Sequence, residues 1–186
     1  MTIQATFRAA LRDVVGPTVR AHGFKGSAPT WRRTNDLGDC AIVNVQGSSS
    51  SSSSSGRFVI NISVVPAPWA AWMEENLGRR PKALPESWGL YRDRLHPSGP
   101  SSGPERWWRV DRPWIAEDVA ADMVRQLDAH GWPVLERLLD REAMVEHARA
   151  GGMGTREGVG RGVCDRSTGL ITAAGHCRWR SLEFAA

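Results

Sequence analysis

Apolar and polar residues alternate most regularly along two neighbouring stretches, residues 40–46 and 57–65. In the second stretch, one face carries only apolar residues: Phe58, Ile60, Ile62 and Val64. The opposite face carries the polar residues Arg57, Asn61 and Ser63, as expected of a strand with one buried and one solvated face. The first stretch alternates in the same way and is rich in β-branched residues. The two stretches therefore predict an antiparallel hairpin around which the rest of the chain is organised.

Helical periodicity flanks this hairpin on both sides. Apolar residues spaced three and four apart predict helices over residues 2–21, 113–131 and 132–149. Gly16-Pro17 is expected to end or kink the first helix, since proline has no N–H to donate, and Gly131 is expected to close the second. Short additional elements are expected as strands over residues 30–34, 90–95 and 105–111 and as a helix over residues 69–77.

Together these elements predict one α+β domain over residues 1–150. We expect an antiparallel sheet of about four to five strands, with the N-terminal helix and the two C-terminal helices packed on one face. The polar face of the sheet is expected to stay partly open. The serine run in residues 47–56 predicts a flexible hairpin loop, and the Gly- and Arg-rich residues 151–186 predict a disordered tail.

Composition narrows the class of protein. Hydrophobic residues make up 41% of the 186-residue chain, which is enough for a real core. No apolar run approaches the roughly 18 residues of a membrane span, and the first residues do not resemble a signal peptide. The three cysteines suit a reducing compartment, so we expect a cytoplasmic protein. The net charge of +4 comes almost entirely from arginine, a bias typical of GC-rich coding DNA, and does not by itself indicate nucleic-acid binding.

Several short motifs occur in an order that resembles a known bacterial family. They follow the amphipathic first helix: Gly23-Phe24-Lys25, Trp31-Arg32-Arg33, Phe58-Val59-Ile60-Asn61-Ile62, Arg92-Asp93-Arg94-Leu95 and Trp107-Trp108. This order resembles the family called domain of unknown function 4304 (DUF4304), over roughly residues 5–145. The resemblance implies a small α+β fold and assigns no activity. The chain departs from the family pattern in its serine tip, in Tyr91 before the Arg-x-Arg motif, and in its tail.

The polar sheet face is the candidate binding site. Its members combine amides, arginines and flat aromatic rings: Asn44, Gln46, Asn61, Arg92, Arg94, Trp107 and Trp108. Amides donate and accept hydrogen bonds, and guanidinium groups bind carboxylates or phosphates, so the mixture suits a polar or anionic ligand. The alternative is a solvated face with surface ion pairs and one tryptophan in the core.

Catalytic and metal-binding motifs are absent from the sequence. The histidines do not pair on one helical face, and Cys164, His176 and Cys177 lack the paired spacing of a zinc site, so no cofactor or metal is expected. We therefore expect a non-enzymatic interaction module that binds a protein partner and no membrane. The first alternative is nucleic-acid binding through the arginines and the basic tail. The second is a hydrolase that uses Asp93, Asp111 or His96 as acid and base.

Overall fold

The computed structural model describes residues 2–52, 54–98 and 107–151. This part of the chain contains a six-stranded antiparallel sheet: β1 (Lys25–Ser27), β2 (Thr30–Thr34), β3 (Cys40–Gly47), β4 (Gly56–Val65), β5 (Tyr91–Leu95) and β6 (Trp108–Val110). The strands run in the order β1-β2-β3-β4-β5, and β6 pairs with the beginning of β4 on the edge that β5 occupies further along. The predicted hairpin is the central pair β3–β4, and β1 is a strand that the sequence pattern did not predict.

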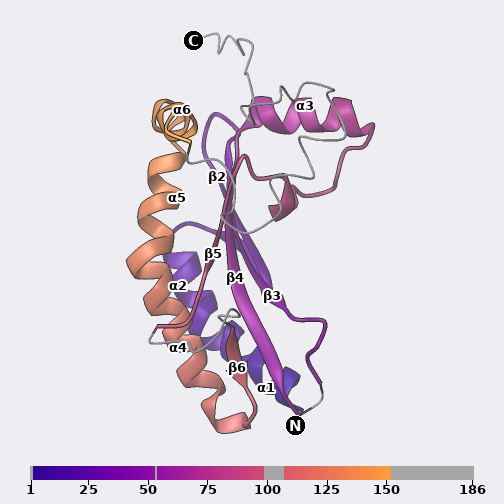
Figure 1. Cartoon of the computed structure of the whole chain (residues 1–186), viewed down its shortest axis with the longest axis vertical. Coiled ribbons are helices and arrows are strands. Elements are labelled where there is room, and N and C mark those ends of the chain that lie inside the picture. The colour runs from indigo at the N-terminus through magenta and orange to yellow at the C-terminus, as the bar shows by residue number, and fades with distance from the viewer. Residues whose placement is uncertain (1, 53, 99–106, 152–186) are drawn as a thin grey trace. The chain divides into compact units, whose positions relative to one another are not determined.

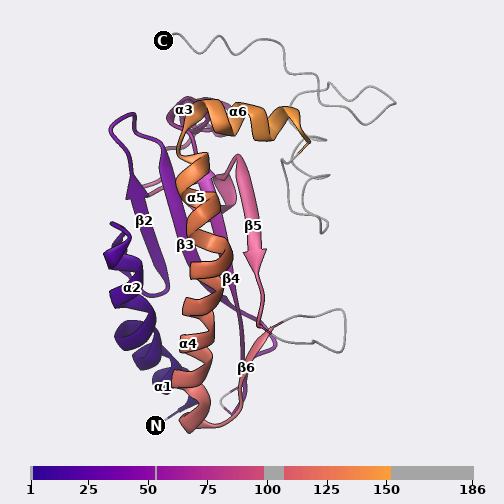
Figure 2. The same ribbon diagram turned by 90° about the vertical axis from the view of Figure 1, so that its left-hand side faces the viewer.

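The helices lie on both faces of the sheet. They are α1 (Ile3–Ala10), η1 (Leu11–Val15), α2 (Gly16–Ala21), α3 (Ala67–Leu77), η2 (Glu86–Trp88), η3 (Pro113–Ile115), α4 (Ala116–Gln126), η4 (Leu127–Gly131), α5 (Trp132–Leu138) and α6 (Arg141–Arg149). Figures 1 and 2 show α1–α2 and α4–α5 along one face, and α3 on the other face near one end of the sheet. The α+β class and the helix layer on one face are thus confirmed. The predicted tail lies outside the described residues, apart from Gly151.

Two π-helical segments let the long helices continue past a proline. Both η1 and η4 are π-helical, and each is followed by one residue and then by Pro17 or Pro133. Proline has no N–H to donate, and its ring clashes with the carbonyl group four residues before it. A π turn adds one residue at this point, so the helix accommodates the ring and continues. The first helix therefore reaches Ala21. The predicted end at Gly131 is wrong, because α4, η4 and α5 follow one another without a break.

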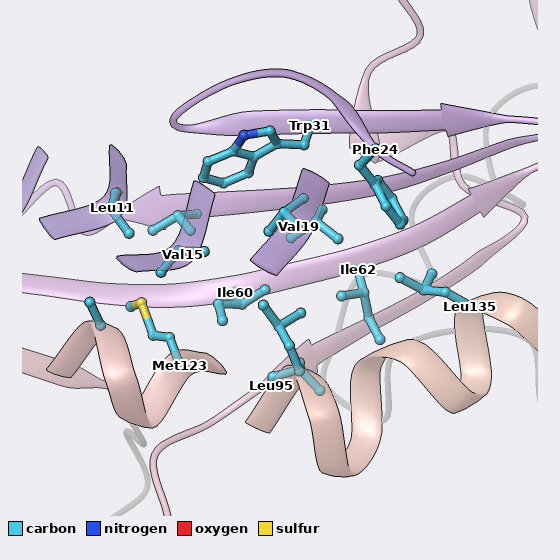
Figure 3. Packing of buried hydrophobic residues seen from close by; sticks show 14 of the residues in the cluster. Leu11, Val15, Val19, Phe24, Trp31, Ile60, Ile62, Leu95, Met123 and Leu135 are labelled. Carbon is cyan, nitrogen blue, oxygen red and sulfur yellow. The ribbon is translucent and has the colours of Figure 1, made fainter. Parts of the chain in front are cut away.

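The main core fills the space between the sheet and these two long helices. Figure 3 shows residues of the first helix facing strand residues, with Met123 and Leu135 of the second helix beside them. The largest fully buried side chains come from all of these elements: Phe7, Val15, Val19, Trp31, Ile60, Ile62, Met123, Leu127 and Leu135. Burying each such side chain stabilises the fold by about 1.5–3 kcal/mol. The apolar alternation of β4 thus faces the helix layer.

A buried carboxylate joins three segments at one end of the sheet. Asp39 is 2% exposed and accepts hydrogen bonds from Arg141 Nε at 2.9 Å and Arg141 Nη2 at 3.0 Å. It also accepts from the backbone N–H of Ala67 at 2.8 Å. Burial by itself would raise the Asp39 pKa, but these hydrogen bonds outweigh it and the pKa lies below its usual value. Asp39 therefore holds the β2–β3 turn against α3 and α6.

A second buried carboxylate holds β6 and the end of the β5 segment on α4. Asp122 accepts from Trp108 Nε1 at 2.8 Å, from the backbone N–H of Ser98 at 3.1 Å and from the Ser98 hydroxyl. Arg125 adds an ion pair at 3.0 Å. Burial raises the Asp122 pKa, yet the hydrogen bonds dominate and the pKa is lowered overall. Local sequence patterns could not single out either aspartate, since both roles depend on contacts between distant segments.

Candidate functional site

A small hydrophobic cluster covers one part of the sheet face on which α3 packs. Its buried members come from β3, β4, α3 and η2: Cys40, Ile42, Val65, Ala70, Met73 and Trp88. Burial raises the pKa of the Cys40 thiol, which therefore acts as an apolar filler. Within the described residues, no helix covers the other half of this surface (Figure 1). This uncovered half carries the candidate site.

A row of four polar residues crosses the uncovered half. Register places Thr30, Asn44, Asn61 and Arg94 directly opposite one another on β2, β3, β4 and β5. Asn44 Nδ2 donates to Thr30 Oγ1 at 2.8 Å, and Arg94 Nε donates to Asn61 Oδ1 at 3.0 Å. Asn61 Nδ2 in turn donates to Gln46 Oε1 at 2.8 Å. Strand alternation predicted that Asn44, Asn61 and Arg94 share a face, and the pairing register brings them together and adds Thr30.

Arg94 is the charged end of this row. Its guanidinium lies 5.8 Å from the centre of the Trp107 ring, a distance typical of a cation–π contact. Both side chains are half-buried. Among residues 2–52, 54–98 and 107–151, no carboxylate forms an ion pair with Arg94. Asn61 and Trp107 therefore hold the guanidinium in place while its positive charge stays uncompensated by those residues.

Two further arginines lie further along the same side of the sheet. Arg57 on β4 and Arg109 on β6 lie directly opposite each other, and Arg109 is exposed. The fully buried Val59 lies on the same side of β4, between Arg57 and Asn61. We call the polar strand residues on this side of the uncovered half the polar face: Thr30, Asn44, Gln46, Arg57, Asn61, Arg94 and Arg109. None of them is acidic. The candidate site predicted from the sequence did not include Arg57 or Arg109. Each is adjacent to an apolar strand residue, Phe58 or Trp108, and this alternation would have placed both arginines on the outward side.

The structure separates Arg92 and Trp108 from the other candidate residues. Arg92 Nε is bonded to Glu86 Oε1 at 3.0 Å, and Arg32 Nε in the same row donates to the Leu84 carbonyl at 2.8 Å. Both arginines thus hold the segment that leads into η2. Trp108 points into the core on the helix side, is 3% exposed and binds Asp122. Of the two candidate tryptophans, Trp107 alone therefore flanks the polar face.

The arrangement of titratable residues does not assemble a hydrolytic centre in the described part of the chain. Asp93 lies on the opposite face from Arg94 and accepts hydrogen bonds from the Tyr91 hydroxyl at 3.3 Å and the Arg94 backbone N–H at 2.7 Å. Asp111 is exposed. No three His, Cys, Asp or Glu side chains in residues 2–52, 54–98 and 107–151 are placed to hold a metal ion. Cys164, His176 and Cys177 lie outside these residues. The helices described here include none long and apolar enough to cross a membrane.

Comparison with known proteins identifies the family. A family model described as a domain of unknown function, DUF4304, matches residues 15–137, so the chain belongs to this family. No curated protein and no solved structure matches the chain. The matched segment runs from the end of η1 to α5 and includes all six described strands. The polar face is therefore built entirely from residues within the family match.

Proposed function

We propose that this member of the DUF4304 family is a non-enzymatic interaction module that binds an acidic segment of a partner protein on its polar face. The observation that carries this proposal is that the Arg94 side chain is held in place without a counter-charge. Its guanidinium is positioned by Asn61 and Trp107, yet no described carboxylate forms an ion pair with it. A cation that is held in place without a counter-charge favours an anionic partner.

The charge of the polar face supports the same type of ligand. Arg94 and Arg109 lie on the same side of the sheet, opposite Asn61 and Arg57 of β4, and the polar face as defined includes no acidic residue. Arginine binds carboxylates through two parallel hydrogen bonds, and a cluster of arginines attracts an acidic chain before contact is made. Gln46, which is exposed, and Asn44, which is half-buried, add neutral donors and acceptors for a peptide backbone.

Preorganisation distinguishes Arg94 from an ordinary surface arginine. Asn61 is only 5% exposed and is fixed by its bond to Gln46, so its Oδ1 is a rigid acceptor for Arg94 Nε. Because the side chain is already ordered, a ligand loses less binding free energy to rotamer immobilisation. This role also makes Asn61 a positioning residue, since little of its surface is available for contact with a partner.

Nucleic-acid binding is the second candidate, because guanidinium groups beside an aromatic ring also suit a single strand of DNA or RNA. Such platforms usually stack successive bases on several exposed rings. Among the residues that the structure describes, the tryptophan beside the polar face is Trp107, which is half-buried and already lies against Arg94. The shortage of aromatic surface favours an acidic protein segment over a nucleic acid.

The test compares two probes of equal charge on the full chain. Binding of a fluorescein-labelled hexaglutamate peptide and of a labelled oligo-dT of matched charge is measured by anisotropy. Two double variants are used: Arg94→Gln with Arg109→Gln, and, as a control of equal net charge, Arg79→Gln with Arg149→Gln. Arg79 and Arg149 are exposed and lie outside the polar face. Circular dichroism confirms that both variants are folded.

We expect the peptide to bind wild type and control alike, and the Arg94/Arg109 variant about tenfold or more weakly, as loss of charged hydrogen bonds implies. Capture from cell extract, with and without nuclease, then identifies the natural partner. Unchanged peptide binding by a folded Arg94/Arg109 variant would remove the polar face from the proposal. Preference for oligo-dT, with affinity falling steeply as salt rises, would favour the nucleic-acid candidate instead.

A further inference from the structure

A groove of about 620 Å³ lies on the helix side of the sheet, where the first helix meets the ends of β2 and β3. Its apolar lining comes from both layers: Phe7, Leu11, Trp31, Val45 and Phe58. Phe7 and Phe58 stack with their ring centres 3.8 Å apart, which makes part of this lining rigid. The volume is within the range of small-molecule sites, about 300–1,000 Å³. The groove and the polar face lie on opposite sides of the sheet.

The wall of the groove contains a buried donor without an acceptor. Trp31 is 1% exposed, and its Nε1 makes no hydrogen bond within the described residues. Figure 3 shows its ring on the side of β2 that faces Leu11 and Val15 of the first helix. Buried indole N–H groups usually find a partner, because leaving one unpaired is costly. The Trp31 ring forms part of the groove lining, so its indole N–H signal can report on a molecule bound there.

Arginines of the first helix form the charged rim of the groove. Arg8, Arg12 and Arg20 all line it, and Arg12 is paired with Asp13 at 2.7 Å. Arg8 and Arg20 make no ion pair with any residue that the structure describes. The two unpaired guanidinium groups give the open side of an apolar groove a positive charge.

The shape of the helix explains how these arginines share one side. In a regular α-helix four residues rotate by about 40° more than one full turn. Residues at positions 8, 12, 16 and 20 would therefore point in progressively different directions around the helix axis. The wider π turn of η1 offsets part of this drift. Gly16 leaves space on the helix surface, because a Cβ there would come within 3.2 Å of Arg20 Nη1. Arg20 therefore runs back along the helix toward the groove.

We propose that this groove binds a small amphiphile, an apolar chain or ring that carries one carboxylate. The apolar part lies against Phe7, Leu11 and Phe58. The carboxylate accepts hydrogen bonds from the rim arginines Arg8 and Arg20. An uncharged apolar molecule would leave the arginines unused, and a small anion would leave the apolar surface uncovered. The groove combines both features and thus matches a ligand that has both.

The experiment uses decanoate, below its micellar concentration, and 1-decanol as the uncharged probe of equal chain length. Two-dimensional ¹H–¹⁵N NMR of the full chain follows the indole N–H signals. Trp31→Phe identifies the Trp31 signal, and Trp114 provides a control signal because its side chain is 72% exposed and lies outside the groove. Affinities are measured for wild type, for Arg8→Gln with Arg20→Gln, and for the exposed control Arg149→Gln.

We expect decanoate to shift the Trp31 signal saturably and to bind about tenfold or more tightly than decanol. The Arg8/Arg20 variant should lose that advantage, while Arg149→Gln should keep it. The proposal is overturned if saturating decanoate leaves the Trp31 signal unmoved, or if the folded Arg8/Arg20 variant binds decanoate as tightly as wild type. None of these results bears on the polar face, since neither arginine belongs to it.

Discussion

Replacing Asp39 with alanine tests whether a buried carboxylate holds the β2–β3 turn against α3 and α6. The substitution removes the acceptor of Arg141 Nε and Nη2, at 2.9 and 3.0 Å, and of the Ala67 N–H at 2.8 Å. Breaking a buried ion pair typically costs about 3–5 kcal/mol. The Arg141 side chain is 30% exposed and can be rehydrated, which favours the lower end of that range. We expect Asp39→Ala to lower the free energy of unfolding by about 3 kcal/mol.

Urea denaturation followed by circular dichroism at pH 7 measures this loss, and Arg141→Ala together with the double variant completes a thermodynamic cycle. Because the two side chains share their hydrogen bonds, the double variant should be little less stable than Asp39→Ala alone. A loss below about 1 kcal/mol, typical of a surface ion pair, would refute the anchoring role. Additive effects of the two single substitutions would likewise show that the pair is not coupled.

The pH dependence of stability is a second test of the Asp39 hydrogen bonds. The Asp39 pKa is lower in the folded protein than its ordinary value of about 3.9, so the unfolded chain binds the proton first. Its stabilisation is therefore fully present above about pH 4 and is lost as the pH falls through the folded pKa. The stability difference between wild type and Asp39→Ala should shrink in acid. A difference that stays constant from pH 7 down to pH 3 would contradict the lowered pKa.

Two further substitutions test the packing of β4 against its neighbours. Ser63 is fully buried and its hydroxyl has no partner within the described residues, so Ser63→Ala should change stability by less than about 0.5 kcal/mol or increase it. A clear loss in urea denaturation would reveal a hydrogen bond that this reasoning omits. Gly89→Ala should cost about 1–3 kcal/mol, because the new Cβ would lie 2.5 Å from the Tyr91 carbonyl oxygen and 2.6 Å from Ser63 Cβ. Wild-type stability of Gly89→Ala would show that this contact relaxes without cost.

The candidate site was only partly predictable from the sequence. Alternation with period two placed Asn44, Asn61 and Arg94 on one face, and the structure agrees because every strand that carries them has its other face in the core. The same rule puts adjacent residues on opposite faces of the sheet. Trp107 and Trp108 therefore could not both lie beside the polar face. Arg92 obeys the alternation as well, but Glu86 pairs with it from a segment whose position no local pattern indicates.

The sequence by itself determined the α+β class, the central hairpin, the helix layer and the family, because hydrophobic periodicity and ordered short motifs are local properties of the chain. Only the tertiary structure decided which half of the polar surface stays uncovered, since that depends on where α3 and η2 dock. It also decided that the long helices continue past Pro17 and Pro133, because core packing on both sides of each proline favours a π turn over a break. The groove beside Trp31 is likewise decided by the tertiary structure, because its lining residues come from distant parts of the sequence and only folding brings them together.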